Sequence, residues 1–313
     1  MAITASQVKE LREMTGSGMM DCKKALTATN GDMEKAVEWL REKGLATAQK
    51  KASRIAAEGV SMAAVSADGR KAVVVEVNSE TDFVAKNEKF QNYVRQVAEH
   101  ALVTAAEGLE AFMKQTSKVD PDKTVEEVLA GQIAVIGENL KIRRFQKIEE
   151  ENGIVVAYTH MGGKIVSIVD LETDVDNDAV REIGKNIAMQ VAALKPQYTS
   201  SDEVPQEFKD KEIEILTKQI AEDPKMAGKP EKVIAGAVQG RLNKELKEIC
   251  LLDQVYVKAE DGKQTVAQYV AQAGKEAGAN VKIKGFIRFE TGEGLEKKNE
   301  DFAAEVAAQM AGN

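Results

Sequence analysis

The chain has 313 residues, with 43 Lys plus Arg against 51 Asp plus Glu, and therefore a formal net charge of −8. This acidity disfavours broad binding to the phosphate backbone of a nucleic acid. The composition, 43% hydrophobic and 30% charged, is typical of a folded protein rather than a disordered one. Apolar runs are too short for a membrane helix of ~20 residues, and no basic-then-apolar leader begins the sequence. We therefore expect a cytoplasmic protein whose two cysteines, Cys22 and Cys250, are reduced.

Residues typical of catalysis or metal binding are scarce. The two histidines, His100 and His160, have no second His or Cys at metal-ligand spacing. Gly-x-Gly segments at Gly16 and Gly292 lack the third glycine of a dinucleotide loop, and the phosphate-loop and nucleophile-elbow motifs are missing. We expect no catalytic residues, no metal site and no cofactor, and thus a binding protein rather than an enzyme.

The first 50 or so residues predict three short helices. Thr4 and Gln7 form a plausible capping box, and Asp32 can cap the third helix. Three apolar stripes would bury one another in a small bundle that resembles a ubiquitin-associated module. Met19 and Met20 follow a glycine turn, so either one of them is exposed or both are core residues.

The basic stretch at residues 41–58 has two interpretations. It is either a nucleic-acid patch or simply a charged linker or helix end, and the lack of interleaved aromatic residues favours the second interpretation. Its main basic residues are Lys43, Lys50, Lys51 and Arg54.

An internal repeat follows. Gly59 to Val77 and Gly153 to Leu171 align at an offset of 94, and so do the turn glycines Gly69 and Gly163. Each copy reads as a β-hairpin followed by a helix. The second strand of each hairpin is almost entirely apolar, as expected where both faces of a sheet are covered. The sequence therefore predicts an α+β core built from two equivalent halves.

Further elements surround this repeat. Thr124 can cap a helix that precedes a strand at residues 141–148, and residues 205–249 read as a helical hairpin around a proline-containing turn. The hairpin has a narrow apolar stripe, so we expect it to project and to suit self-association or partner contact. A last strand should direct four alternating apolar residues inward, and residues 301–310 should form a closing helix. These four residues are Val281, Ile283, Ile287 and Phe289.

The two repeats differ where the first strand pair leads into its helix. There the first copy reads EVNSETDFVAKNEKFQ. Thr81 or Asp82 can cap the coming helix, which leaves Phe83 off the helical stripe. Phe83 is then either a hydrophobic staple on its own helix or an exposed anchor for a partner pocket.

Several stretches resemble the bacterial translation elongation factor Ts family: LREMTGSGMMDCKKAL, EVNSETDFVAKNEKFQ, IGENLKIRRF, IAMQVAALKP and KGFIRFETGEG. The resemblance implies a guanine-nucleotide exchange factor for elongation factor Tu that does not bind nucleotide itself. It favours an exposed Phe83, because the family's corresponding element wedges into Tu and displaces its Mg²⁺. The resemblance implies partner contacts at Thr81, Asp82, Phe83 and Val84, a second contact at His160, Met161, Gly162 and Gly163, and bundle contacts at Met19 and Met20.

The resemblance also implies a division of the chain. We expect an N-terminal three-helix domain, a core in two halves, an inserted hairpin and a C-terminal module that adds partner contact. The hairpin would form a homodimer, giving a complex with two copies of each protein; neither membrane nor nucleic acid is an expected partner. A ubiquitin-like or RNA-binding adaptor is the alternative. The expected divisions are 1–54, 55–148, 149–204 with 251–290, 205–250 and 291–313.

Overall fold

The computed structural model describes residues 3–296. Its N-terminal part is the predicted bundle of three helices, α1 (Ala5–Thr15), α2 (Met19–Ala28) and α3 (Met33–Lys51). The capping box of Thr4 and the cap by Asp32 are both confirmed. Helix α3 continues through most of the basic stretch and packs against a helix of the core, so that stretch is largely a helix end, as the favoured interpretation allows.

The core contains two antiparallel three-stranded sheets. Each is a hairpin extended by a strand from much later in the chain, with strand orders β1-β2-β3 and β4-β5-β6. Both predicted hairpins and the strand at 141–148 are therefore confirmed. The strands are β1 (Glu58–Val65), β2 (Lys71–Ser79), β3 (Lys141–Glu149), β4 (Gly153–His160), β5 (Ile165–Thr173) and β6 (Val281–Glu290).

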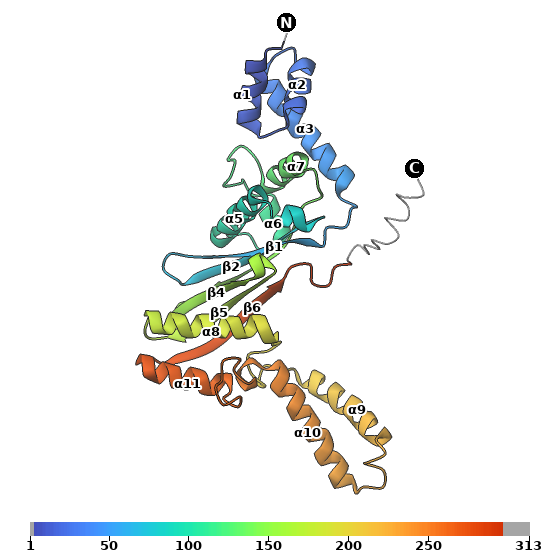
Figure 1. Cartoon of the computed structure of the whole chain (residues 1–313), viewed down its shortest axis with the longest axis vertical. Coiled ribbons are helices and arrows are strands. Elements are labelled where there is room, and N and C mark those ends of the chain that lie inside the picture. The colour runs from blue at the N-terminus through green and yellow to red at the C-terminus, as the bar shows by residue number, and fades with distance from the viewer. Residues whose placement is uncertain (1–2, 297–313) are drawn as a thin grey trace.

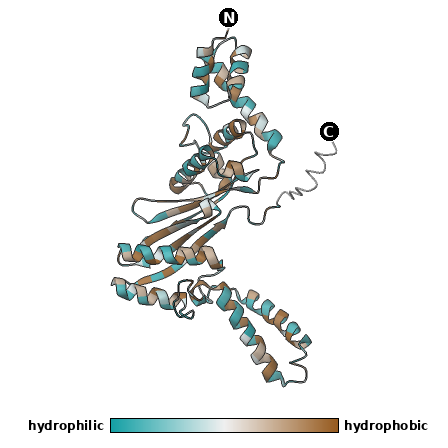
Figure 2. Cartoon of the chain, viewed as in Figure 1, coloured by the Kyte–Doolittle hydropathy of each residue, from teal (hydrophilic) through white to brown (hydrophobic). Residues whose placement is uncertain are grey.

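The sheets and their helices form four layers (Figure 1). Helices on the N-terminal side cover the first sheet, the two sheets pack face to face, and another pair of helices covers the second sheet. Figure 2 shows hydrophobic residues concentrated in the strands, which are covered on both faces. The covering helices are α5 (Glu88–Val103), α6 (Leu109–Met113) and α7 (Val125–Ile136) on one side, and α8 (Asp178–Leu194) and α11 (Val266–Ala277) on the other.

The repeat is longer than the two hairpins. Helices α7 and α11 both begin at a Thr capping box, Thr124 and Thr265, and both end at a left-handed Gly, Gly137 and Gly278. Each pair lies 141 positions apart, and the same offset relates β3 to β6. The third strand of each sheet therefore belongs to the repeat, although α11 and α6 were not predicted.

The glycine that opens each copy is required by close packing of the strands. A Cβ atom on Gly59 would lie 2.2 Å from the carbonyl oxygen of Val77, and one on Gly153 would lie 1.9 Å from that of Leu171. Both distances are far below van der Waals contact with backbone atoms that cannot move aside. The matched glycines therefore mark the same close approach of two paired strands in each half.

One expectation for the last strand is wrong. The pairing of β5 with β6 shifts between Asp170 and Leu171, because Lys284 is an extra residue in a β-bulge. The bulge reverses the alternation of side chains, so Ile283 packs in the core under α8 and α11, whereas Ile287 and Phe289 pack between the two sheets. The four apolar residues therefore do not share one face.

The predicted helical hairpin is α9 (Gln206–Glu222) and α10 (Glu231–Ile249), which projects from the body in Figure 1. Its own small core consists of Leu216, Ile220, Val238 and Leu242. The predicted closing helix at residues 301–310 lies outside the described residues. Within residues 3–296, no helix combines the length and the apolar character needed to cross a membrane.

Candidate partner-binding site

A short helix, α4 (Asp82–Ala85), forms the corner between β2 and α5. Thr81 begins it, and the Thr81 hydroxyl accepts a hydrogen bond from the Val84 amide at 3.3 Å. Phe83 is 81% exposed, so the staple interpretation is wrong. Asp82 pairs with Lys86 at 2.6 Å, and this hydrogen bond lowers the pKa of the Asp82 carboxyl. The corner thus presents a large aromatic ring to solvent beside an ionised carboxylate.

A side chain from the end of α7 holds this corner in place. The Glu138 carboxylate accepts hydrogen bonds from the amides of Glu80 and Thr81, at 3.0 and 3.1 Å, and from the Thr81 hydroxyl at 2.6 Å. Helix α5 has a separate cap, Asn87, so neither Thr81 nor Asp82 caps it as predicted. Sequence reasoning missed Glu138 because its partners are distant in the chain, although it lies in the IGENLKIRRF stretch. The backbone below Phe83 is therefore fixed at several points.

The second predicted contact is the turn between β4 and β5. His160 ends β4, and the turn η1 (Met161–Gly163) follows, with Met161 74% exposed. Met161 has a φ of +48°, and Gly162 and Gly163 also have positive φ. The Tyr158 hydroxyl lies 3.0 Å from His160 Nδ1 and can orient the imidazole. Tyr158 was not predicted, yet its position two residues before His160 on one strand places it on the same face.

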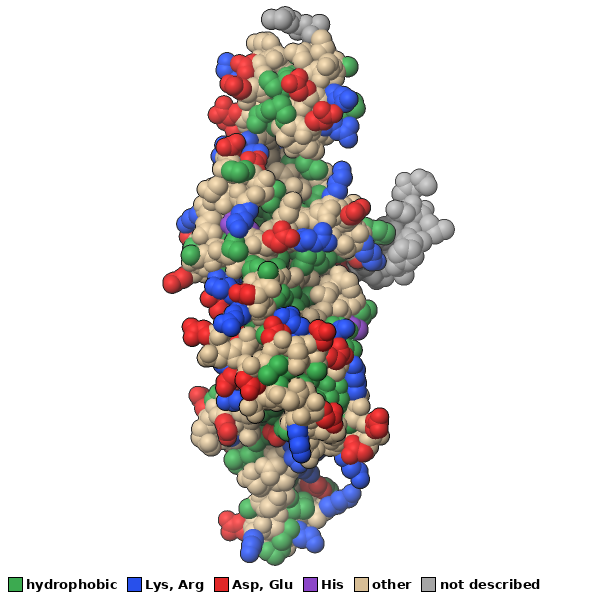
Figure 3. Space-filling view, turned by 90° about the vertical axis from the view of Figure 1, so that its left-hand side faces the viewer, with side chains coloured by type: hydrophobic (Ala, Val, Ile, Leu, Met, Phe, Trp, Pro, Cys, Tyr) green, Lys and Arg blue, Asp and Glu red, His purple; other side chains and the backbone are tan. Residues whose placement is uncertain are grey.

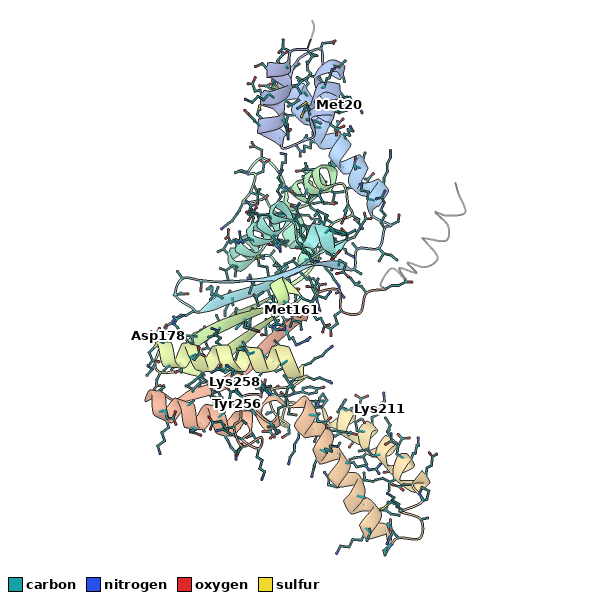
Figure 4. All side chains as sticks on the ribbon, viewed as in Figure 1. Met20, Met161, Asp178, Lys211, Tyr256 and Lys258 are labelled. Carbon is teal, nitrogen blue, oxygen red and sulfur yellow. The ribbon has the colours of Figure 1, made fainter. Side chains whose placement is uncertain are left out.

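Three methionines of the bundle are on its surface, whereas Met33 packs against its core. Met19 and Met20 are 59% and 63% exposed, and the core interpretation is wrong for both. Met14, at the end of α1, is exposed as well. Figure 4 shows Met20 on the N-terminal bundle and Met161 near the middle of the molecule. Flexible, polarisable thioethers on a surface suit contact with another protein.

The basic groups near the end of the bundle are mostly paired within the chain. Arg41 pairs with Glu127, Lys43 with Asp21, and Arg54 with Glu80 at 3.4 Å. Lys51 donates to the carbonyl of Gly137. Acidic and basic side chains are interspersed on the face shown in Figure 3. These interactions use charges that a nucleic-acid patch would need. Those of Arg41, Lys51 and Arg54 connect the N-terminal part to the core, whereas the Lys43–Asp21 pair joins two helices of the bundle.

The buried histidine and the two buried cysteines are packing residues. His100 lies 4.9 Å from Phe112 between ring centroids, and burial lowers the pKa of its imidazole. Burial raises the pKa of both thiols, that of Cys250 to about 11. In residues 3–296 no three His, Cys, Asp or Glu side chains come together as a metal site would require.

Exposed apolar side chains on two turns and on a helical bundle are features typical of a protein that binds another protein. Comparison with known sequences gives the family. The family described as "Elongation factor TS" matches residues 80–293. Proteins named "Elongation factor Ts" from Clostridium botulinum (strain Eklund 17B / Type B) and Clostridioides difficile (strain 630) are 48% and 50% identical to this chain, in each case over 98% of it and 99% of the relative. A relative of the same name from Clostridium perfringens (strain ATCC 13124) is 49% identical over 97% of this chain and 98% of its own length. The chain belongs to the elongation factor Ts family.

Proposed function

We propose that this protein is a guanine-nucleotide exchange factor for elongation factor Tu. It binds Tu–GDP, perturbs the Mg²⁺ and phosphate site, and promotes GDP release during translation elongation, without a catalytic site of its own. The observation that carries the proposal is Phe83, an aromatic ring 81% exposed at a corner whose backbone is held by Glu138. The family match beginning at residue 80 covers this corner.

The physical argument is one of linked binding. Tu holds GDP partly through Mg²⁺, which neutralises phosphate oxygens. A partner that binds best when this site is distorted must weaken GDP binding by the same factor by which GDP weakens the partner. An aromatic anchor contributes ≥ 2 kcal/mol, about a 30-fold change in affinity. Burying the Phe83 ring in Tu is therefore large enough to change GDP release appreciably.

The other groups of the corner, the turn and the bundle extend this contact, although Val84 is half-buried and Gly163 is buried. Asp82 and Val84 flank the ring, and Thr81 fixes the backbone. His160, Met161, Gly162 and Gly163 form the second contact, and Met19 and Met20 extend it to the bundle. GTP or GDP then rebinds to Tu and expels the factor. The factor therefore changes the rate of exchange and leaves the affinity of free Tu for nucleotide unchanged. The nucleotide bound at equilibrium is therefore set by the nucleotide pool.

The test is stopped-flow release of a fluorescent GDP from Tu, chased with unlabelled GDP. We expect substoichiometric amounts of this protein to accelerate release over many turnovers. Because the proposed route passes through loss of Mg²⁺, chelating free Mg²⁺ should accelerate the unassisted reaction and reduce the advantage given by the factor. Release that stays at the unassisted rate at every concentration of this protein would reject the proposal.

The projecting hairpin is the surface we propose for self-association, which would give a complex of two copies with two Tu molecules. It exposes apolar side chains at Ile215 and Val233, which are 38% and 47% exposed. Sedimentation equilibrium of the full chain and of Val233→Glu tests this directly. A concentration-dependent mass that the substitution abolishes supports dimerisation through the hairpin, and a monomer at all concentrations rejects it.

A further inference from the structure

The residues that follow β6 leave the second sheet and pack against the first. Thr291 is 2% exposed although it lies just after a strand end. Gly292 has a φ of +78°, and a Cβ atom there would lie 2.2 Å from the carbonyl oxygen of Ala57. This crossing segment, Thr291 to Glu293, is therefore tightly enclosed and not a free extension of the chain.

Thr291 is bonded to the turn of the second partner contact. Its amide donates to the carbonyl of Lys164 at 2.9 Å, and its hydroxyl donates to the carbonyl of Gly163, also at 2.9 Å. The buried hydroxyl of Ser61, on β1, lies 2.8 Å from the Thr291 hydroxyl. Since the Thr291 hydroxyl has one proton, Ser61 is left to donate to it. One side chain thus joins the second-half turn to the first sheet.

Glu76, on β2, holds the next residue of the crossing segment. This carboxylate is fully buried, and it accepts hydrogen bonds from the Gly292 amide at 2.8 Å, from Arg143 at 2.9 Å and from Arg144 at 2.6 Å. Arg143 also donates to the Glu293 carbonyl at 2.7 Å. Burial alone would raise the pKa of Glu76, but these hydrogen bonds outweigh it and lower the pKa below its ordinary value. Strand β2 then runs directly to the corner that carries Phe83.

The turn held by Thr291 has an unfavourable backbone. A non-glycine residue with positive φ, such as Met161, is uncommon and persists where its surroundings fix it. Gly163 has no room to relax, because a Cβ atom there would lie 2.6 Å from Val60 Cγ1 and 2.7 Å from the Ser61 carbonyl oxygen. The exposed Met161 side chain is therefore presented by a conformation that depends on contacts from β1 and from the crossing segment.

The equivalent position in the first half is used differently. There Glu150 corresponds to Thr291. The residue that corresponds to Glu76 is Asp170, on β5 of the second half, at the same bulged position of its sheet. Glu150 pairs with Lys284 at 2.8 Å beside Asp170. The fold of the repeat therefore does not itself require a hydroxyl at this position. The hydrogen bond from Thr291 to the turn is found only in the half that carries the second contact.

We propose that Thr291 and Glu76 are positioning residues, which lock the turn His160–Gly163 to the strand that carries the Phe83 corner and so fix the two partner contacts relative to each other. This inference rests on the proposed exchange function. Neither residue needs to touch Tu, since Thr291 and Glu76 are both buried. Their effect on exchange passes through the turn.

The test compares Thr291→Val, which removes the hydroxyl, with Thr291→Ser, which keeps it. Ser167→Ala is the matched control, because the Ser167 hydroxyl is also fully buried and donates to the Ala188 carbonyl at 2.7 Å, away from the turn. We expect Thr291→Val to slow factor-stimulated GDP release by about three- to tenfold, the effect of losing one or two hydrogen bonds. Thr291→Ser and Ser167→Ala should stay close to the unmodified chain.

Two further measurements separate positioning from general destabilisation. In a His160→Ala, Met161→Ala background, Thr291→Val should have little additional effect, because the contacts that it positions are gone. Hydrogen exchange of the free protein should show faster exchange of amides from Met161 to Ile165 in Thr291→Val, with those of α10 unchanged.

The outcomes are distinguishable. Equal slowing by Ser167→Ala, an undiminished effect in the background without turn contacts, or unchanged amide exchange in the turn would each overturn the positioning role. If the unmodified protein fails to accelerate GDP release, the proposed function falls, while amide exchange still decides whether Thr291 holds the turn.

Discussion

Replacing Phe83 by alanine should separate partner binding from stability. Because the ring is 81% exposed, only about a fifth of its area is buried within the chain. Full burial of a Phe side chain stabilises by about 1.5–3 kcal/mol, so the substitution should cost about 0.5 kcal/mol, or about 1–2 °C in Tm. If the ring is the anchor for Tu, the same change should weaken the complex about 30-fold or more.

Phe90, seven residues later, is the matched control, because its ring is buried whereas that of Phe83 is exposed. It is fully buried in the first-half core, and replacing a buried Phe by alanine costs about 3–5 kcal/mol. Phe90→Ala should therefore lower Tm by about 10 °C. Where the variant is still folded, it should exchange nucleotide at a rate close to that of the unmodified protein.

The assay pairs thermal unfolding by circular dichroism with stopped-flow release of fluorescent GDP from Tu, both at one temperature well below the lower Tm. We expect Phe83→Ala to melt normally and to lose most of its stimulation of GDP release. Two results would refute the reasoning. The first is a large fall in Tm for Phe83→Ala, which would show that the ring stabilises the fold. The second is normal melting with undiminished exchange, which would show that the ring does not anchor Tu.

Three further predictions concern titratable groups. Burial, the hydrogen bond that the protonated Asp170 donates to Glu150 and the negative charge of Glu150 raise the pKa of Asp170 to about 7. The native state therefore holds this proton more tightly than the unfolded chain, so this stability is present below the ordinary value of 3.8 and is lost as pH rises through about 7. Asp170→Asn should thus raise Tm relative to the unmodified chain by more at pH 8 than at pH 5, and an equal effect at both pH values would contradict this. Glu76 has a lowered pKa, so its contribution is present above the ordinary value of 4.5 and is lost as pH falls through the lower, folded-state value. Urea unfolding of Glu76→Gln should show a deficit at pH 7 that shrinks toward pH 3, and a deficit independent of pH would argue against an ionised carboxylate. Finally, Cys22 and Cys250 are fully buried with raised thiol pKa values, so a disulfide reagent at pH 8 should label them only after denaturation; rapid labelling of the native protein would show that one is accessible.

Much of the fold followed from periodicity and glycine placement. The offset of 94 identified two hairpins because the paired strands approach so closely at one point that each hairpin needs a glycine there, as the contacts of Gly59 and Gly153 show. Local capping rules placed the starts of α1, α3 and α7, since the partners of those caps lie within a few residues. These features depend on short-range chemistry that a sequence displays directly.

The remainder depends on long-range pairing. The bulge at Lys284 arises from the register between β5 and β6. The adjacent Gly285 is a local sign of it, since an isolated glycine inside a strand often marks a bulge, but it does not fix which residue is the extra one. Glu138 and Glu76 look like ordinary surface glutamates in the sequence, yet each accepts hydrogen bonds from segments far along the chain. The residues alone left two interpretations of Phe83 open, because exposure is decided by how α4 sits on the sheet; only the family resemblance favoured the correct one.

The strand order has a consequence for synthesis on the ribosome. The first sheet has all its strands once Glu149 has emerged. The second sheet is complete only when β6 has been made, and α8, the helical hairpin and α11 all lie between β5 and β6 in the chain. Long-range strand pairing of this kind is slow to form, and nascent domains fold as their segments become available. Thr291 emerges later still. A nascent chain would therefore form the Phe83 corner early. The turn His160–Gly163 would be held in place only near the end of translation, so the two proposed contacts become ready in the order in which the two halves are made.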